Sequence, residues 1–82
     1  MPTTFASQQI KHRTALLIFI KGSSAPLVLY IDNPQETYNE LHSLLQNNVT
    51  KVVEKTTNGP IKKVCFLTSQ ISAIALQEEQ FV

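Results

Sequence analysis

A chain of 82 residues with seven basic and six acidic side chains has room for one small domain and carries a formal net charge of +1. This balance argues against strong attraction to nucleic acid or to acidic membranes. A single cysteine excludes an intramolecular disulfide and fits a reducing compartment. Residues 1–13 hold no apolar run of signal-peptide length, and no apolar run approaches the roughly 20 residues that span a bilayer. We therefore expect a cytoplasmic protein with no membrane segment.

The chain begins with a polar stretch that leads into a predicted β-hairpin. Residues 1–13 lack periodicity, so we expect a flexible N-terminal extension. The apolar, β-branched run over residues 14–21 predicts a strand, because it is too short for a typical buried helix. Gly22 and Pro26 bound a segment with the residue types of a turn, and residues 27–31 predict the second strand.

One amphipathic helix is predicted over residues 34–46. Asn33 is suited to accept a hydrogen bond from the first-turn amides, Pro34 suits the first helical position, and Glu36 completes a capping-box spacing. Four apolar side chains share one stripe at three-to-four spacing: Tyr38, Leu41, Leu44 and Leu45. The asparagines at 47–48 are suited to end the helix, because asparagine tolerates left-handed backbone geometry.

Further strands follow the helix. Apolar and polar side chains alternate over residues 49–56 well enough to predict a third strand. Asn58-Gly59 is a strong hairpin signal, and residues 61–68 predict the fourth strand. A last strand, or a short turn followed by one, lies over residues 71–77. Residues 78–82 form a C-terminal tail that we expect to fray.

These elements predict an α+β fold of two layers. Its sheet has four to five mainly antiparallel strands and carries one helix, in the order β-β-α-β-β, and its single domain spans residues 14–77. The two-residue turn would also set the register of the third and fourth strands. Glu54 would then face Lys63 as a charge pair. Lys55 would face Lys62, which is unfavourable unless an anionic group lies nearby or both side chains turn to water.

The first predicted strand is apolar on both faces. Alternation places two sets on opposite sides, Leu16, Ile18 and Ile20 against Ala15, Leu17 and Phe19. One helix covers only one face of a sheet, so the second apolar face needs another cover. We expect a second copy of the chain, giving a homodimer, or another protein; a terminal segment folded over the face is the alternative. The candidate interface residues are Ala15, Leu17, Phe19, Cys65 and Leu67.

Residues with catalytic or metal-binding chemistry are few and scattered. Cys65 lies in mid-strand, where a thiol is usually an inert small hydrophobe. His12 and His42 are interpreted as surface residues, and one cysteine with two distant histidines does not supply a zinc site. The two glycines both lie in predicted turns, which excludes a glycine-rich phosphate loop. We expect no catalytic residues, no metal, no cofactor and no enzymatic activity.

Three lysines suggest a second hypothesis. In the predicted register Lys51, Lys55 and Lys62 share one sheet face, with Phe66 close by. A basic strand face with an aromatic residue is typical of some single-strand nucleic-acid binders. Solvent-facing lysines also protect strand edges, and nearby acids almost cancel the charge. Weak binding of nucleic acid or another anion is therefore the alternative function, and a protein-interaction module is the favoured one.

Three segments carry a resemblance to a known family: Ala25-Pro26-Leu27, the helical run over residues 36–41, and the run over residues 62–74 with its lysine pair and apolar strand. From Ala15 onward, the chain resembles a family of small cyanobacterial proteins of order ββαββ. It departs from that family at Gln70, where a glutamate is frequent, and in its long N-terminal extension. The resemblance implies the fold, a cytosolic setting and a photosynthetic bacterial source, with no established activity to carry over.

Overall fold

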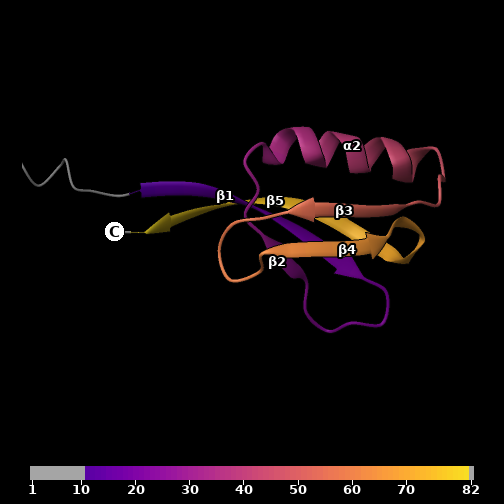
Figure 1. Ribbon diagram of the computed structural model, residues 1–82, viewed down its shortest axis with the longest axis horizontal. Coiled ribbons are helices and arrows are strands. Elements are labelled where there is room, and N and C mark those ends of the chain that lie inside the picture. Colours follow the sequence, from indigo (N-terminus) through magenta and orange to yellow (C-terminus); the bar gives the residue numbers. More distant parts are fainter. Residues whose placement is uncertain (1–10, 82) are drawn as a thin grey trace, which may run out of the picture.

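A computed structural model describes residues 11–81 of the chain. Its elements in chain order are β1 (Lys11–Ile20), β2 (Leu27–Leu29), α2 (Pro34–Gln46), β3 (Val52–Thr56), β4 (Lys63–Leu67), the 3₁₀ turn η1 (Thr68–Gln70) and β5 (Ile71–Phe81). β2, β1 and β5 form an antiparallel three-stranded sheet in that order, while β3 and β4 form an antiparallel two-stranded sheet (Figure 1). The predicted α+β class and element order are confirmed, with the strands divided between two sheets instead of one.

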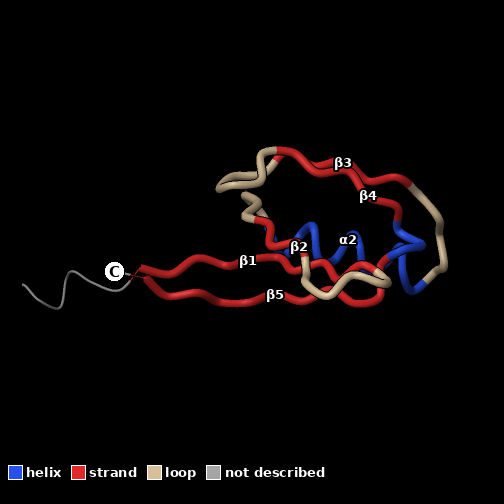
Figure 2. Tube along the Cα trace, turned by 90° about the horizontal axis from the view of Figure 1, so that it is seen from below, coloured by secondary structure: helices blue, strands red, loops and turns tan. Residues whose placement is uncertain are grey.

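The helix and both sheets enclose one hydrophobic core. Its buried members are Leu16, Ile18, Leu29, Leu41, Val53, Phe66 and Ile71. Figure 2 shows β3 and β4 on one side of the molecule and β1 and β5 on the other. Each sheet therefore gives one face to the core, which we call its inner face, and turns an outer face away from it.

The helix has the predicted bounds. Pro34 occupies the first turn, but the Asn33 side chain makes no capping hydrogen bond, which corrects the prediction for this residue. The C-terminal end follows the prediction, because Asn48 adopts a φ of +54°. The amide of Val49 then donates to the carbonyl of Leu44 at 2.9 Å, as in a Schellman motif.

The pairing of β1 with β5 is longer than the sequence pattern indicates. β5 runs to Phe81 and pairs with β1 as far as Lys11, so residues 78–81 belong to a strand and the predicted frayed tail is wrong for them. Their partners are the first residues of β1, far away in sequence, so no local pattern reveals the pairing. Residues 1–10, most of the predicted flexible extension, lie outside the described residues.

The predicted register of β3 and β4 is wrong by two residues. Glu54 lies opposite Cys65, and Lys55 lies opposite Val64 instead of Lys62. Because the shift is even, every residue keeps its predicted face of the sheet. The predicted ion pair forms on the diagonal, with 3.5 Å between Lys63 Nζ and Glu54 Oε2.

A longer loop between β3 and β4 causes this shift. The Thr57 amide donates to the Lys62 carbonyl at 2.9 Å, which closes the loop, and the Asn58 amide donates to the Tyr30 carbonyl at 2.7 Å. Gly59, at a φ of +84°, lies against the Tyr30 ring, so that a Cβ there would be 2.7 Å from Tyr30 Cδ2. The loop thus packs on the residue that follows β2.

Candidate interaction surface

Three of the five predicted interface residues lie on the outer face of the three-stranded sheet. They are Ala15, Leu17 and Phe19, which alternate along β1 with the core residues Leu16 and Ile18. Within residues 11–81, α2 and the two-stranded sheet pack on the inner face, and neither adds a residue to this outer one. Leu17 and Phe19 are half-buried by flanking side chains, whereas Ala15 is 0% exposed and offers no contact surface.

Neighbouring strands enlarge this apolar surface. Leu17 lies opposite Val28 on one side and Ala75 on the other, and Phe19 lies opposite Ala73. We call Leu17, Phe19, Val28, Ala73 and Ala75 the apolar patch. Sequence reasoning missed the last three as interface residues, because naming them needs the pairing of β1 with β2 and with β5.

The other two predicted interface residues lie elsewhere. Cys65 and Leu67 are on the outer face of the two-stranded sheet. This sheet lies across the core from β1 and β5 (Figure 2). Leu67 is 37% exposed and faces Val52, which is 60% exposed, while Cys65 faces Glu54. The structure therefore does not bring the five residues together, and this second apolar area is short and bordered by charges.

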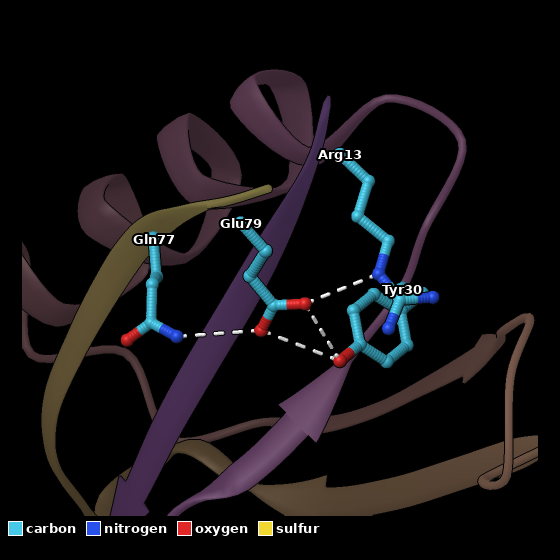
Figure 3. Close-up of polar contacts among 4 residues, drawn as sticks. All are labelled: Arg13, Tyr30, Gln77 and Glu79. Atoms are coloured by element: carbon cyan, nitrogen blue, oxygen red, sulfur yellow. Dashed lines mark hydrogen bonds and ion pairs between the residues drawn. The ribbon is translucent and has the colours of Figure 1, made fainter. Parts of the chain in front are cut away.

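A polar cluster occupies one end of the outer face of the three-stranded sheet (Figure 3). Arg13 Nε lies 3.1 Å from Glu79 Oε1, and the Tyr30 hydroxyl donates to the same oxygen at 3.0 Å. Gln77 Nε2 donates to Glu79 Oε2 at 3.3 Å. The Arg13 guanidinium carbon also lies 3.8 Å from the centre of the Tyr30 ring, in cation–π geometry. These contacts join β1, the residue after β2, and β5.

The pKa shifts in this cluster are consistent with a structural role. Desolvation raises the pKa of Tyr30, and its hydrogen bond to Glu79 raises it further. Desolvation alone would raise the pKa of Glu79, but hydrogen bonds from Tyr30 and Arg13 and the charge of Arg13 outweigh it and lower the pKa overall. At neutral pH the cluster therefore holds a neutral phenol that donates a hydrogen bond to a charged carboxylate, which links β5 to the residue after β2.

The three candidate anion-binding lysines are not a shared free patch. Lys55 Nζ lies 2.9 Å from Glu40 Oε1 of the helix and is partly neutralised by it. Lys51 precedes β3, and its amide donates to Thr68 Oγ1 at 2.8 Å. Lys62 lies in the loop before β4 and not opposite Lys55. Phe66, the aromatic residue on which the nucleic-acid hypothesis also relied, lies in the core and is 7% exposed, so it is not available to stack on a base.

The histidines and the cysteine stay apart from one another. His12 Nδ1 lies 3.6 Å from Glu78 Oε2, and the His42 ring stacks on Tyr38 within the helix. The Cys65 thiol is exposed on β4. Among the described residues, no group of three or more His, Cys, Asp and Glu side chains could hold a metal ion. No helix within residues 11–81 has the length and apolar character to cross a membrane.

An open cavity of about 470 Å³ lies where the end of α2 meets η1 and the start of β5. Its lining includes Leu44, Val49, Ile71 and Lys21, and this lysine is the one titratable residue among the described residues that line it. The Thr68 hydroxyl at its wall is already used, since it donates to the Val49 carbonyl at 2.7 Å. The cavity therefore presents no acid–base pair.

No family model, curated protein or solved structure matches this chain. The resemblance to small cyanobacterial proteins remains a prediction.

Proposed function

We propose that this protein is a non-enzymatic interaction module that associates with a second copy of itself through the apolar patch. One observation carries the proposal. Leu17 and Phe19 lie in the central strand and have apolar neighbours on both sides, yet within residues 11–81 no helix or strand packs over them. Strands that are apolar on both faces are typical of sheets covered on both sides. The cover for this face is therefore expected from outside residues 11–81, and we propose a second chain as that cover in preference to a terminal segment.

A second copy satisfies the geometric requirement. Two patches related by a two-fold axis present the same residues to each other, as an isologous interface requires. Sheets that stack face to face lie about 10 Å apart, and their side chains interdigitate. The polar cluster around Glu79 borders the patch at one end, as the rim of a protein interface does.

The strength of the association follows from burial. Full burial of a large apolar side chain contributes about 1.5–3 kcal/mol. Leu17, Phe19 and Val28 are already half-buried in the single chain, so each contributes only part of that amount. We therefore expect a reversible homodimer, in which the driving force is apolar and depends little on salt.

Two further parts of the proposal concern setting and alternatives. A cytoplasmic location is proposed on the grounds of composition and the single exposed cysteine. A different protein that binds the same patch is the closest alternative, and it predicts a monomer when the chain is pure. Nucleic-acid binding would instead weaken steeply with salt, and the ion pair between Lys55 and Glu40 argues against it.

Sedimentation velocity over a range of concentrations tests the proposal, with two matched variants. Phe19→Asp places a charge in the apolar patch and is expected to weaken association at least about tenfold, the change that 1.4 kcal/mol produces. Val52→Asp makes a similar apolar-to-acid change on the outer face of the other sheet and should leave association unchanged. If folded Phe19→Asp associates as strongly as the unmodified protein, the apolar patch is not the interface.

A further inference from the structure

The three-stranded sheet has two edges, and they differ in protection. At one edge, β2 has only three residues. Tyr30 follows β2, and its carbonyl accepts a hydrogen bond from the amide of Asn58 in the β3–β4 loop. At the other edge β5 has eleven residues, and within the described part of the chain its hydrogen-bonded neighbour is β1 alone. Along the free side of β5, backbone amides and carbonyls are therefore available to pair with another strand.

Between Ala73 and Gln77, β5 lacks the usual protection of an edge strand, because its two charged residues, Glu78 and Glu79, lie nearer its end. Natural edge strands are commonly short, bulged, or marked by lysine or proline. β3 and β4 fit this description, with five residues each and with Lys55 and Lys63 among them. β5 contains neither lysine nor proline, and its register irregularity with β1 lies at its start, beside Ser72. From Ala73 to Phe81 the strand is regular.

We propose that β5 pairs antiparallel with β5 of a second copy, which joins the two three-stranded sheets into one sheet of six strands. The alternation of side chains between the two faces of a strand restricts the register of this pairing. Paired residues must lie on the same face, so a two-fold axis has to place one residue opposite itself. With Leu76 on the axis, residues 73–79 of the two strands face each other within the regular part of β5, and Ala75 of one copy lies opposite Gln77 of the other.

Charge is compatible with this register and disfavours an axis at either glutamate. β5 is apolar from Ile71 to Leu76, apart from Ser72, and its two acidic residues are Glu78 and Glu79. With Leu76 on the axis, Glu78 lies opposite Ile74 of the second copy, and no two carboxylates oppose each other. An axis moved to Glu78 would place that carboxylate opposite itself, an arrangement that destabilises cross-strand pairs.

The position of the helix also fits. Figure 1 shows α2 beside the half of the molecule where β5 begins, while the end of β5 extends with β1 beyond the helix. The residues of β5 that pack in the core are consistent with this position of the helix, because Ile71, Ile74 and Leu76 all lie in the first six positions of the strand. Antiparallel pairing places the second helix over the opposite half of the joined strands. The two helices then cover different parts of the six-stranded sheet.

Disulfide cross-linking tests this register in the full chain. Cys65→Ser removes the native thiol from all samples, and protein with Ala75→Cys is mixed with protein with Gln77→Cys under oxidising conditions. Opposed residues of antiparallel strands have Cα atoms about 4.5–5.5 Å apart, within disulfide range. We expect the mixture to form disulfides between positions 75 and 77, identified by peptide mass spectrometry. A matched mixture of Ala75→Cys with Gln80→Cys should form far fewer.

Ala75 also belongs to the apolar patch, so the two mixtures are repeated in protein that carries Phe19→Asp, and this comparison separates the two proposals. Cross-links between positions 75 and 77 that persist when Phe19→Asp is added support edge pairing, whether or not the apolar patch associates. Equal yields in the two mixtures, or no cross-links above random collision, overturn edge pairing. A free edge of that kind would remain open to an extended segment of another protein.

Discussion

The contact between Gly59 and Tyr30 gives the sharpest prediction, because a second glycine provides its control. Gly59 and Gly22 have nearly the same φ, +84° and +81°, so alanine at either position meets the same backbone penalty of about 1–2 kcal/mol. Only at Gly59 does the added Cβ meet a neighbour, Tyr30 Cδ2 at 2.7 Å, whereas nothing lies within 4 Å at Gly22. Overpacking of this kind costs about 1–3 kcal/mol more.

Relief of that overlap has structural consequences. The Tyr30 ring is held by the hydrogen bond from its hydroxyl to Glu79 and by the guanidinium of Arg13. A shift of the ring away from the new Cβ weakens these contacts, while a shift of the loop weakens the hydrogen bond from Asn58 to Tyr30. A chain of this length has a total stability of about 4–12 kcal/mol, so Gly59→Ala removes a substantial part of it.

Urea unfolding followed by circular dichroism measures the difference. We expect Gly59→Ala to be less stable than Gly22→Ala by about 1–3 kcal/mol. In a Tyr30→Ala background the two glycine variants should become more nearly equal, because no side-chain atom beyond Cβ remains at position 30 to overlap with the added Cβ. Equal losses for Gly59→Ala and Gly22→Ala in the unmodified background would refute the packing of the β3–β4 loop on Tyr30.

Three further predictions concern the core, the polar cluster and the end of the helix. Phe66 is 7% exposed, and removing such a ring costs about 3–5 kcal/mol before the cost of burying a carboxylate is added. Phe66→Asp should therefore unfold the domain, whereas Phe19→Asp should keep the circular dichroism spectrum of the unmodified protein. A folded Phe66→Asp would contradict the assigned core. The folded-state pKa of Glu79 lies below its ordinary value of 4.5, so its stabilising contribution is present above that value and is lost as pH falls through the folded-state pKa. Urea unfolding should therefore separate the unmodified protein from Glu79→Gln at pH 7 and bring them together in acid, and a constant difference would contradict the assigned role. Asn48→Val should destabilise by about 1–2 kcal/mol because φ there is +54°, whereas Asn48→Gly should be tolerated; equal effects in urea unfolding would refute the left-handed helix end.

The parts of the fold predicted correctly from the sequence depend on local signals. Pro34, the apolar stripe and Asn48 lie within or beside the helix, and they locate its two ends. Strand order along the chain follows in the same way from β-branched runs and turn residues. The alternation within β1 also separates Leu16 and Ile18 from Leu17 and Phe19 correctly, since one set is in the core and the other outside it.

The missed features join residues that are far apart in the chain. The pairing of Lys11 with Phe81 and the cluster of Arg13, Tyr30 and Glu79 depend on β1 and β5 being neighbours. The β3–β4 loop is longer than its Asn-Gly signal predicts because Asn58 pairs with Tyr30 instead of forming a two-residue turn. The candidate interface was divided for the same reason, because strand parity alone does not show that β4 belongs to a separate sheet.

The central claim is that this chain is built to bind a second copy of itself, and its molar mass in solution tests that claim most directly. Light scattering behind size exclusion, over a range of concentrations and at low and high salt, should give a mass that rises from 9.2 kDa toward a whole multiple of it. The rise should be similar at both salt levels, because the proposed contacts are mainly apolar or between backbones. A mass that stays at 9.2 kDa at every concentration would contradict self-association through either surface.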